Sequence, residues 1–274
     1  MLEMIRYFVV FAGTAISAYT DLRTGLILDK VTYPMIALGI VFSIADVFFL
    51  NSFTQLVVPL LVFAFSFLLY YLGKLGGGDV KIFTAMALLL PSFQGQPFVL
   101  NVLLVAALSS ISILSVYFLF RYFSLKKRER VERKEKARAI LLGIAIMLYF
   151  AVFVQLGFMG FLQALLLGVP LFLGVFAMAF QSGIYREFFL KYVSPKELEE
   201  DEIIAKEFLE PAVLAEAGLS IKGVLDLKAA EKLARAGVKK IPVYRSLPPF
   251  APFLLFGVIV SYFVPDLFSL VFFP

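Results

Sequence analysis

Long apolar runs dominate this chain and restrict its fold more than any other feature. A helix that crosses a membrane needs about 20 predominantly apolar residues. The hydrophobic fraction is 61%, the charged fraction 16% and the mean hydropathy +0.94, whereas a soluble domain is about half apolar and a quarter charged. We therefore expect an all-α polytopic membrane protein with about eight membrane helices, at residues 4–20, 31–50, 54–73, 79–91, 97–121, 139–157, 160–180 and 248–271.

Two stretches depart from the usual length of a membrane helix. The run at 79–91 is too short to cross alone, so its neighbours must bury it. The apolar stretch from 139 to 180 is too long for one helix, and the glycines at Gly157 and Gly160 indicate a turn between two helices.

The basic residues indicate which side of the membrane each connection occupies. With eight crossings, segments 21–30, 74–81, 121–138 and 181–247 share one side and carry 24 of the 25 Lys and Arg residues, whereas Arg6 falls on the other side. Cytoplasmic loops carry an excess of Lys and Arg, so we expect this side to be cytoplasmic in a multi-pass protein of the cell membrane. The net charge of +5 then reflects topology and contact with membrane lipids, and no nucleic-acid partner is expected.

Charge and hydropathy also divide the chain into five expected parts. Within the polar region 181–247, Ser194 and Asp226 occupy helix-cap positions, and VKKIPVYR at 238–245 looks extended, which predicts a mainly helical or mixed subdomain. The five parts are a membrane core at 1–121, a charged cytoplasmic loop at 122–138, two further membrane helices at 139–180, a small cytoplasmic subdomain at 181–247 and a C-terminal membrane helix at 248–274.

The chain contains no Cys and no His. A disulfide framework and a thiolate metal site are therefore excluded, and the commonest metal ligand is missing. We expect neither a metal nor a cofactor. Acid–base chemistry would have to be carried by carboxylates, Lys or Tyr.

Three consecutive glycines precede Asp79 between two apolar segments. Taken alone, Asp79 is best interpreted as a helix N-cap, and the glycines as a loop that adopts positive φ. The same loop lacks side chains, so a substrate backbone could approach it closely.

A second carboxylate, Asp21, ends the first apolar run on the same expected side. It could be a polar stop, but the C-terminal end of a helix favours cations over anions. If Asp21 and Asp79 met, they could share one proton. The ionised member could then activate water while the protonated member assists the leaving amine.

The sequence GKLGGGDVK resembles the G-x-G-D signature of intramembrane aspartyl peptidases, and in particular the type IV prepilin peptidase group with its archaeal preflagellin peptidases. The family's other motif, an Asp and a nearby basic residue at the end of the first helix, falls on Asp21 and Arg23. The longer G-x-G-D pattern falls on Gly73, Gly76, Gly78, Asp79 and Lys81.

The resemblance implies an endopeptidase that removes short basic leader peptides from prepilin-like or preflagellin-like precursors at the cytoplasmic face, with Asp21 and Asp79 as the catalytic residues. It also places Gly76, Gly77, Gly78, Arg23 and Lys81 in the loops next to the substrate. Many members carry Pro-Asn where this chain has Leu28-Asp29. The cysteine-rich zinc loop of bacterial members has no counterpart without Cys, and nothing in the sequence supports their second, methylating activity.

Alternatives to a peptidase stay open from the sequence alone. Arg23, Lys74 and Lys81 fit interfacial anchors better than catalytic groups. A transporter could use Asp21 and Asp79 to bind a proton or cation, with the glycines as the break in a helix. A polytopic scaffold without an active site is the third alternative.

Overall fold

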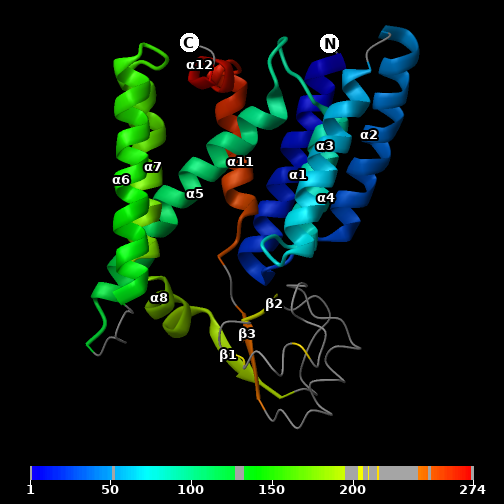
Figure 1. Cartoon of the computed structure of the whole chain (residues 1–274). Coiled ribbons are helices and arrows are strands. Elements are labelled where there is room, and N and C mark those ends of the chain that lie inside the picture. The colour runs from blue at the N-terminus through cyan, green and yellow to red at the C-terminus, as the bar shows by residue number, and fades with distance from the viewer. Residues whose placement is uncertain are drawn as a thin grey trace. The chain divides into compact units, whose positions relative to one another are not determined.

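The structure is a computed structural model that describes residues 2–50, 53–126, 133–194, 203–205, 209, 215, 240–245 and 248–272. Within these described ranges it is mostly helical (Figure 1), and five of the helices there are long and apolar enough to cross a membrane. These helices are α1 (Leu2–Thr24), α2 (Asp29–Leu50), α5 (Phe98–Phe123), α6 (Arg133–Gln155) and α7 (Phe161–Met178). The polytopic membrane class is thus confirmed.

The other predicted apolar helices are shorter. Helices α3 (Thr54–Tyr71) and α11 (Ala251–Phe263) are apolar, but their apolar stretches are shorter than those of the five candidate membrane spans. Helix α4 (Gly77–Leu89) has 13 residues, most of them buried, as expected for a helix too short to cross alone. The turn predicted between 157 and 160 is also confirmed, because α6 ends at Gln155 and α7 begins at Phe161.

The prediction of a single helix at 248–271 is wrong, because the structure has two helices there. They are α11 and a separate short helix, α12 (Leu267–Phe272). Val264, which precedes Pro265, leaves the helical region with φ −131° and ψ 72°. A residue before proline is pushed towards extended conformations, so Pro265 explains the break.

The chain forms two compact units. One contains residues 1–21, 90–187 and 250–274, and the other contains residues 22–89 and 188–249. In the second unit α4 packs against both α2 and α3. The approach of α2 to α4 is close, since a Cβ on Gly39 would lie 2.6 Å from the Leu88 Cβ. The Ser43 hydroxyl of α2 also donates to the Leu88 carbonyl of α4 at 3.0 Å.

In the first unit, α11 packs against α5. A Cβ on Gly257 would lie 2.5 Å from the Val102 carbonyl oxygen, so a glycine is required at this crossing. Helix α1 joins the same unit through the Tyr7 hydroxyl, which donates to the Val258 carbonyl at 3.3 Å. The Tyr7 ring lies 5.5 Å from the Phe93 ring and 4.9 Å from the Tyr262 ring, centroid to centroid.

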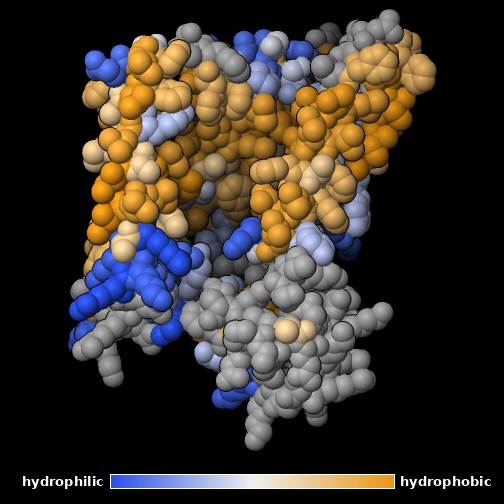
Figure 2. Space-filling view, in the orientation of Figure 1, coloured by the Kyte–Doolittle hydropathy of each residue, from blue (hydrophilic) through white to orange (hydrophobic). Residues whose placement is uncertain are grey.

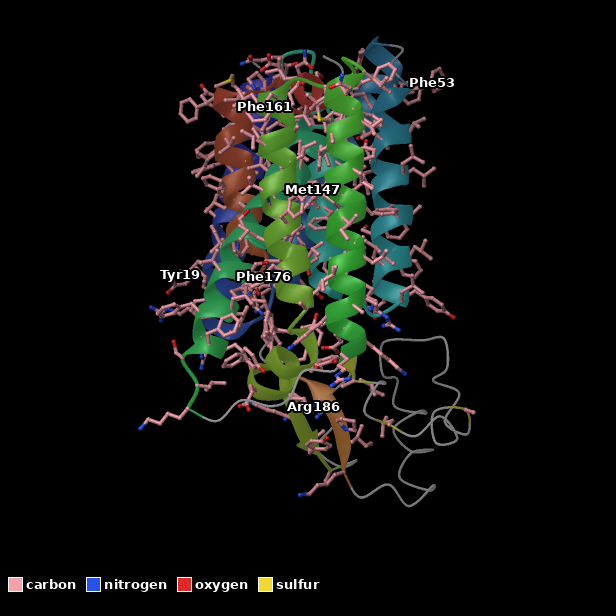
Figure 3. All side chains as sticks on the ribbon, turned by 60° about the vertical axis from the view of Figure 1, so that its left-hand side comes forward. Tyr19, Phe53, Met147, Phe161, Phe176 and Arg186 are labelled. Atoms are coloured by element: carbon pink, nitrogen blue, oxygen red, sulfur yellow. The ribbon has the colours of Figure 1, made fainter. Side chains whose placement is uncertain are left out.

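Helices α6 and α7 pair with each other and carry many exposed apolar side chains. Met147 on α6 is 60% exposed, and Phe161 on α7 is 70% exposed (Figure 3). Figure 2 shows this apolar surface giving way to hydrophilic side chains at the lower end of α6. The exposed basic residues there are Arg133, Lys134, Lys136 and Arg138. Such a surface suits a helix pair that faces lipid and ends at the membrane surface.

The region before α11 contains a short helix, α8 (Gln181–Phe188), and a three-stranded antiparallel sheet. The sheet order is β1 (Leu190–Val193), β3 (Ile241–Tyr244), β2 (Ile203–Ile204). The extended conformation expected for 238–245 is confirmed at β3, and the sheet corrects the all-α class to mostly helical. The residues of β3, Ile-Pro-Val-Tyr, are largely of types that favour strands. The helices expected after Ser194 and after Asp226 lie outside the described residues.

Asn101 of α5 provides a test of how the α11–α12 break is held. Its buried amide donates to the Val264 carbonyl at 2.8 Å and to the Pro265 carbonyl at 3.3 Å, and its oxygen accepts from the Phe268 N–H at 2.9 Å. We expect Asn101→Leu to lower the free energy of unfolding by about 2–3 kcal/mol, because these buried groups lose their partner. Unfolding in detergent measures this, with Ser269→Ala as a milder control because Ser269 makes one hydrogen bond to Gln96. Equal stability of Asn101→Leu and the parent chain would contradict the prediction.

Candidate active site

Asp79 lies in the first turn of α4, at the third helical position. Gly76 precedes the helix, and its carbonyl accepts from the Val80 N–H at 3.3 Å. The Gly76 N–H in turn donates to Asp79 Oδ2 at 3.3 Å. A carboxylate that reaches back from the third position to the N-cap N–H forms half of a capping box. Asp79 therefore helps to cap α4, but from inside the helix and not as the N-cap itself.

Of the three glycines before Asp79, Gly78 is the one most constrained, and the constraint is space and not backbone conformation. None of them has positive φ, whereas Gly73 does, at 70°. A Cβ on Gly78 would lie 2.9 Å from the Ile27 Cβ, and one on Gly76 would lie 3.1 Å from Asp79 Oδ2. A Cβ on Gly77 would make an ordinary contact of 3.5 Å with Tyr70. The positive-φ interpretation of this loop is thus wrong, and Gly78 is required because α4 approaches the α1–α2 connector.

Asp21 lies in the last turn of α1 and is 8% exposed. Its Oδ2 accepts a hydrogen bond from the Ala251 N–H, the first of α11, at 3.0 Å. The N-cap of α11, Phe250, has no side-chain cap of its own. The C-terminal end of α1 disfavours the negative charge of Asp21, and the positive N-terminal end of α11 offsets this effect. This partner could not be predicted from sequence, because it lies far along the chain.

Lys81, the last residue of the glycine-rich motif, pairs with Asp29. Its Nζ lies 2.6 Å from Asp29 Oδ1 and 5.0 Å from the centroid of the Tyr33 ring. Asp29 is the first residue of α2, and sequence reasoning missed it as a partner for Lys81. The one available signal was its place in the Leu28-Asp29 departure from the family pattern. Arg23 lies in the last turn of α1 and is exposed.

The structure brings together two parts of the predicted site within the second unit. The G-x-G-D loop packs on the α1–α2 connector through Gly78 and Ile27, and Lys81 pairs with Asp29. Asp21 belongs to the first unit and Asp79 to the second. The pairing of the two carboxylates and the roles of the loop residues therefore stay predictions.

The capping role of Asp21 has a measurable consequence. We expect Asp21→Ala to lower the free energy of unfolding by about 1 kcal/mol, because the first N–H of α11 loses its acceptor. Asp21→Asn keeps a side-chain oxygen at that place and should lose less. Thermal unfolding of both variants in detergent compares them, and an Asp21→Ala chain as stable as the parent would contradict the cap.

Comparison with known proteins gives the family that part of this chain resembles. Residues 8–119 match the type IV leader peptidase family, and this range contains both Asp21 and Asp79. The chain is also similar to a protein named prepilin peptidase EppA from Methanothermobacter thermautotrophicus, with 25% identity over 179 residues. That alignment covers 58% of this chain and 46% of the relative, so the chain spans about half of the relative's length. The resemblance to the type IV leader peptidase family is thereby confirmed over residues 8–119.

Proposed function

We propose that this protein is a membrane aspartyl endopeptidase that removes short basic leader peptides from prepilin-like or preflagellin-like precursors. The observation that carries the proposal is the family match over residues 8–119, which includes the G-x-G-D motif and both candidate carboxylates. The name of the similar prepilin peptidase supports the same class of substrate. Pilin-like or flagellin precursors and membrane lipids are the partners that follow.

Asp21 and Asp79 would perform the reaction as a pair that shares one proton. The ionised carboxylate takes a proton from water as the water oxygen attacks the scissile carbonyl carbon. The protonated carboxylate polarises the carbonyl oxygen, and a proton is then delivered to the departing amine as the C–N bond breaks. The chemistry needs no His or Cys, and the chain has neither.

Capping and catalysis are compatible roles for these side chains. A carboxylate has two oxygens and about four acceptor sites. The backbone N–H groups of Gly76 and Ala251 each use Oδ2 of their Asp. A hydrogen bond from a backbone N–H also restricts rotation of the carboxylate, which favours a fixed geometry for attack.

The packing of the α1–α2 connector supports the pairing of the two carboxylates. Ile27 lies in this connector, which begins after the last turn of α1 that carries Asp21, and its side chain packs on Gly78 beside Asp79. We place the site at the cytoplasmic face, because Asp21 and Asp79 fall in the segments that carry almost all the basic residues.

The carboxylate pair is tested by near-isosteric substitution. We expect Asp21→Asn and Asp79→Asn each to abolish cleavage of a precursor with a basic leader and an apolar helix, while membrane insertion is kept. Asn retains an acceptor for the N–H groups of Gly76 and Ala251, so the substitution separates catalysis from capping. Their losses should not add in the double variant, because the residues act as one unit.

The control for this assay is Asp266→Asn, which should keep its activity. Asp29→Asn is not a suitable control, since Asp29 pairs with Lys81. A mobility shift of the co-expressed or purified precursor measures cleavage. An inserted Asp79→Asn protein that still cuts at an appreciable rate would falsify the proposal.

The cytoplasmic placement is tested by labelling introduced cysteines. The chain has no Cys of its own, so any labelling comes from the introduced residue. We expect Ser124→Cys, at the end of α5, to be protected from an impermeant thiol reagent in intact cells. Gln94→Cys, in the turn before α5, should be labelled from outside. Labelling of Ser124→Cys from outside would reverse the topology and move the site to the other face.

A further inference from the structure

We propose that the ion pair between Lys81 and Asp29 positions Asp79 by fixing the first turn of α4 to the start of α2. Lys81 and Asp29 are then positioning residues, and neither needs to contact the substrate. The inference rests on the proposed function, in which Asp79 is catalytic, and it assigns a role to Asp29 that the family motif does not contain.

The first turn of α4 has few side chains with which to hold its place. Three glycines, residues 76–78, lead into Asp79, and Asp79 itself reaches back to the Gly76 N–H. Lys81 is the first long side chain after Asp79, and it extends from α4 to α2. The other contact of this turn with the α1–α2 connector is the packing of Ile27 on Gly78. Together these two contacts fix the turn next to residues 27–29.

Helix α2 is a firm reference for this contact because it is fixed to α4 again farther along. Gly39 lets α2 approach Leu88 closely, and Ser43 donates to the Leu88 carbonyl at 3.0 Å. The end of α4 is thus held by packing and by this hydrogen bond. Its beginning is held by the buried Val80, by Ile27 on Gly78 and by the ion pair. Removing the pair should therefore loosen the turn that carries Asp79 without separating the helices.

The geometry of the pair suits an orienting contact. The 2.6 Å separation of Lys81 Nζ and Asp29 Oδ1 is that of a short charge-assisted hydrogen bond. The Lys81 ammonium also lies over the Tyr33 ring, 5.0 Å from its centroid, where a cation is attracted to the ring face. The side chains are 33% and 52% exposed, and a pair this exposed contributes little to global stability. Its loss should therefore change local motion and turnover more than unfolding.

The test compares Lys81→Met, Asp29→Asn and their double variant with the parent chain in detergent. Hydrogen exchange of the backbone amides in residues 76–83 reports the motion of the turn without any need for activity. We expect exchange there to be about tenfold faster than in the parent in each single variant. The double variant should exchange no faster than the single variants, and exchange in residues 98–123 should be unchanged. In the cleavage assay, kcat should fall about tenfold to a hundredfold while KM stays within twofold, because a small misplacement of a catalytic group is costly.

Two controls distinguish this role from general damage. Lys81→Arg can still pair with Asp29, so its exchange and kcat should stay within about threefold of the parent. Lys30→Met removes the exposed cation next to Asp29 and should change neither measurement. Exchange at the parent rate in Lys81→Met and Asp29→Asn, or additive effects in the double variant, would overturn the inference. If the parent chain cuts no precursor, the proposed function fails, and the exchange measurement still decides the positioning role.

Discussion

Backbone N–H groups at the starts of two helices hold the two carboxylates on which the proposed chemistry depends. The first N–H groups of a helix have no partner within it, and an unsatisfied backbone group is costly where water is excluded, as at the buried Ala251. Helix α4 begins after Gly76, which has no side chain to cap it, and α11 begins after Phe250, whose side chain makes no capping hydrogen bond. Asp79 supplies an acceptor for the Gly76 N–H, and Asp21 supplies one for Ala251.

This constraint joins the fold to the site. A sequence alone presents capping and catalysis as competing explanations of an aspartate, and capping is the commoner one. In this chain one oxygen of each carboxylate satisfies a helix start, and the side chain gains a defined orientation as a result. The positions of the two carboxylates therefore depend on helix packing. Gly257 allows α11 to approach α5 closely, and Gly39 allows α2 to approach α4 closely.

Much of the fold could be predicted, because long apolar runs leave few alternatives in a membrane. The helices and the turn near Gly157 follow from hydropathy and glycine alone. The break at Pro265 was not predicted, because the apolar run continues across it. The sheet was only partly predicted, since β2 has two residues and pairs with a strand far along the chain.

The site was predictable in its motif residues but not in their partners. Asp21, Asp79 and Lys81 stand out by type and spacing, whereas the Ala251 N–H and Asp29 become partners only through tertiary packing. The register of α2 against α4 decides which carboxylate meets Lys81. Nothing in local sequence specifies that register.

Disulfide formation in an Asp21→Cys, Asp79→Cys double variant tests the pairing of the two carboxylates most directly. The parent chain has no Cys, and a disulfide requires Cα atoms within roughly 7 Å. We predict that mild oxidation of the inserted protein removes both thiols from labelling in this variant. The thiols of an Asp79→Cys, Asp266→Cys reference should stay reactive. Two thiols that remain fully labelled in the 21/79 variant, in a protein that is inserted and folded, would contradict a catalytic pair formed by Asp21 and Asp79.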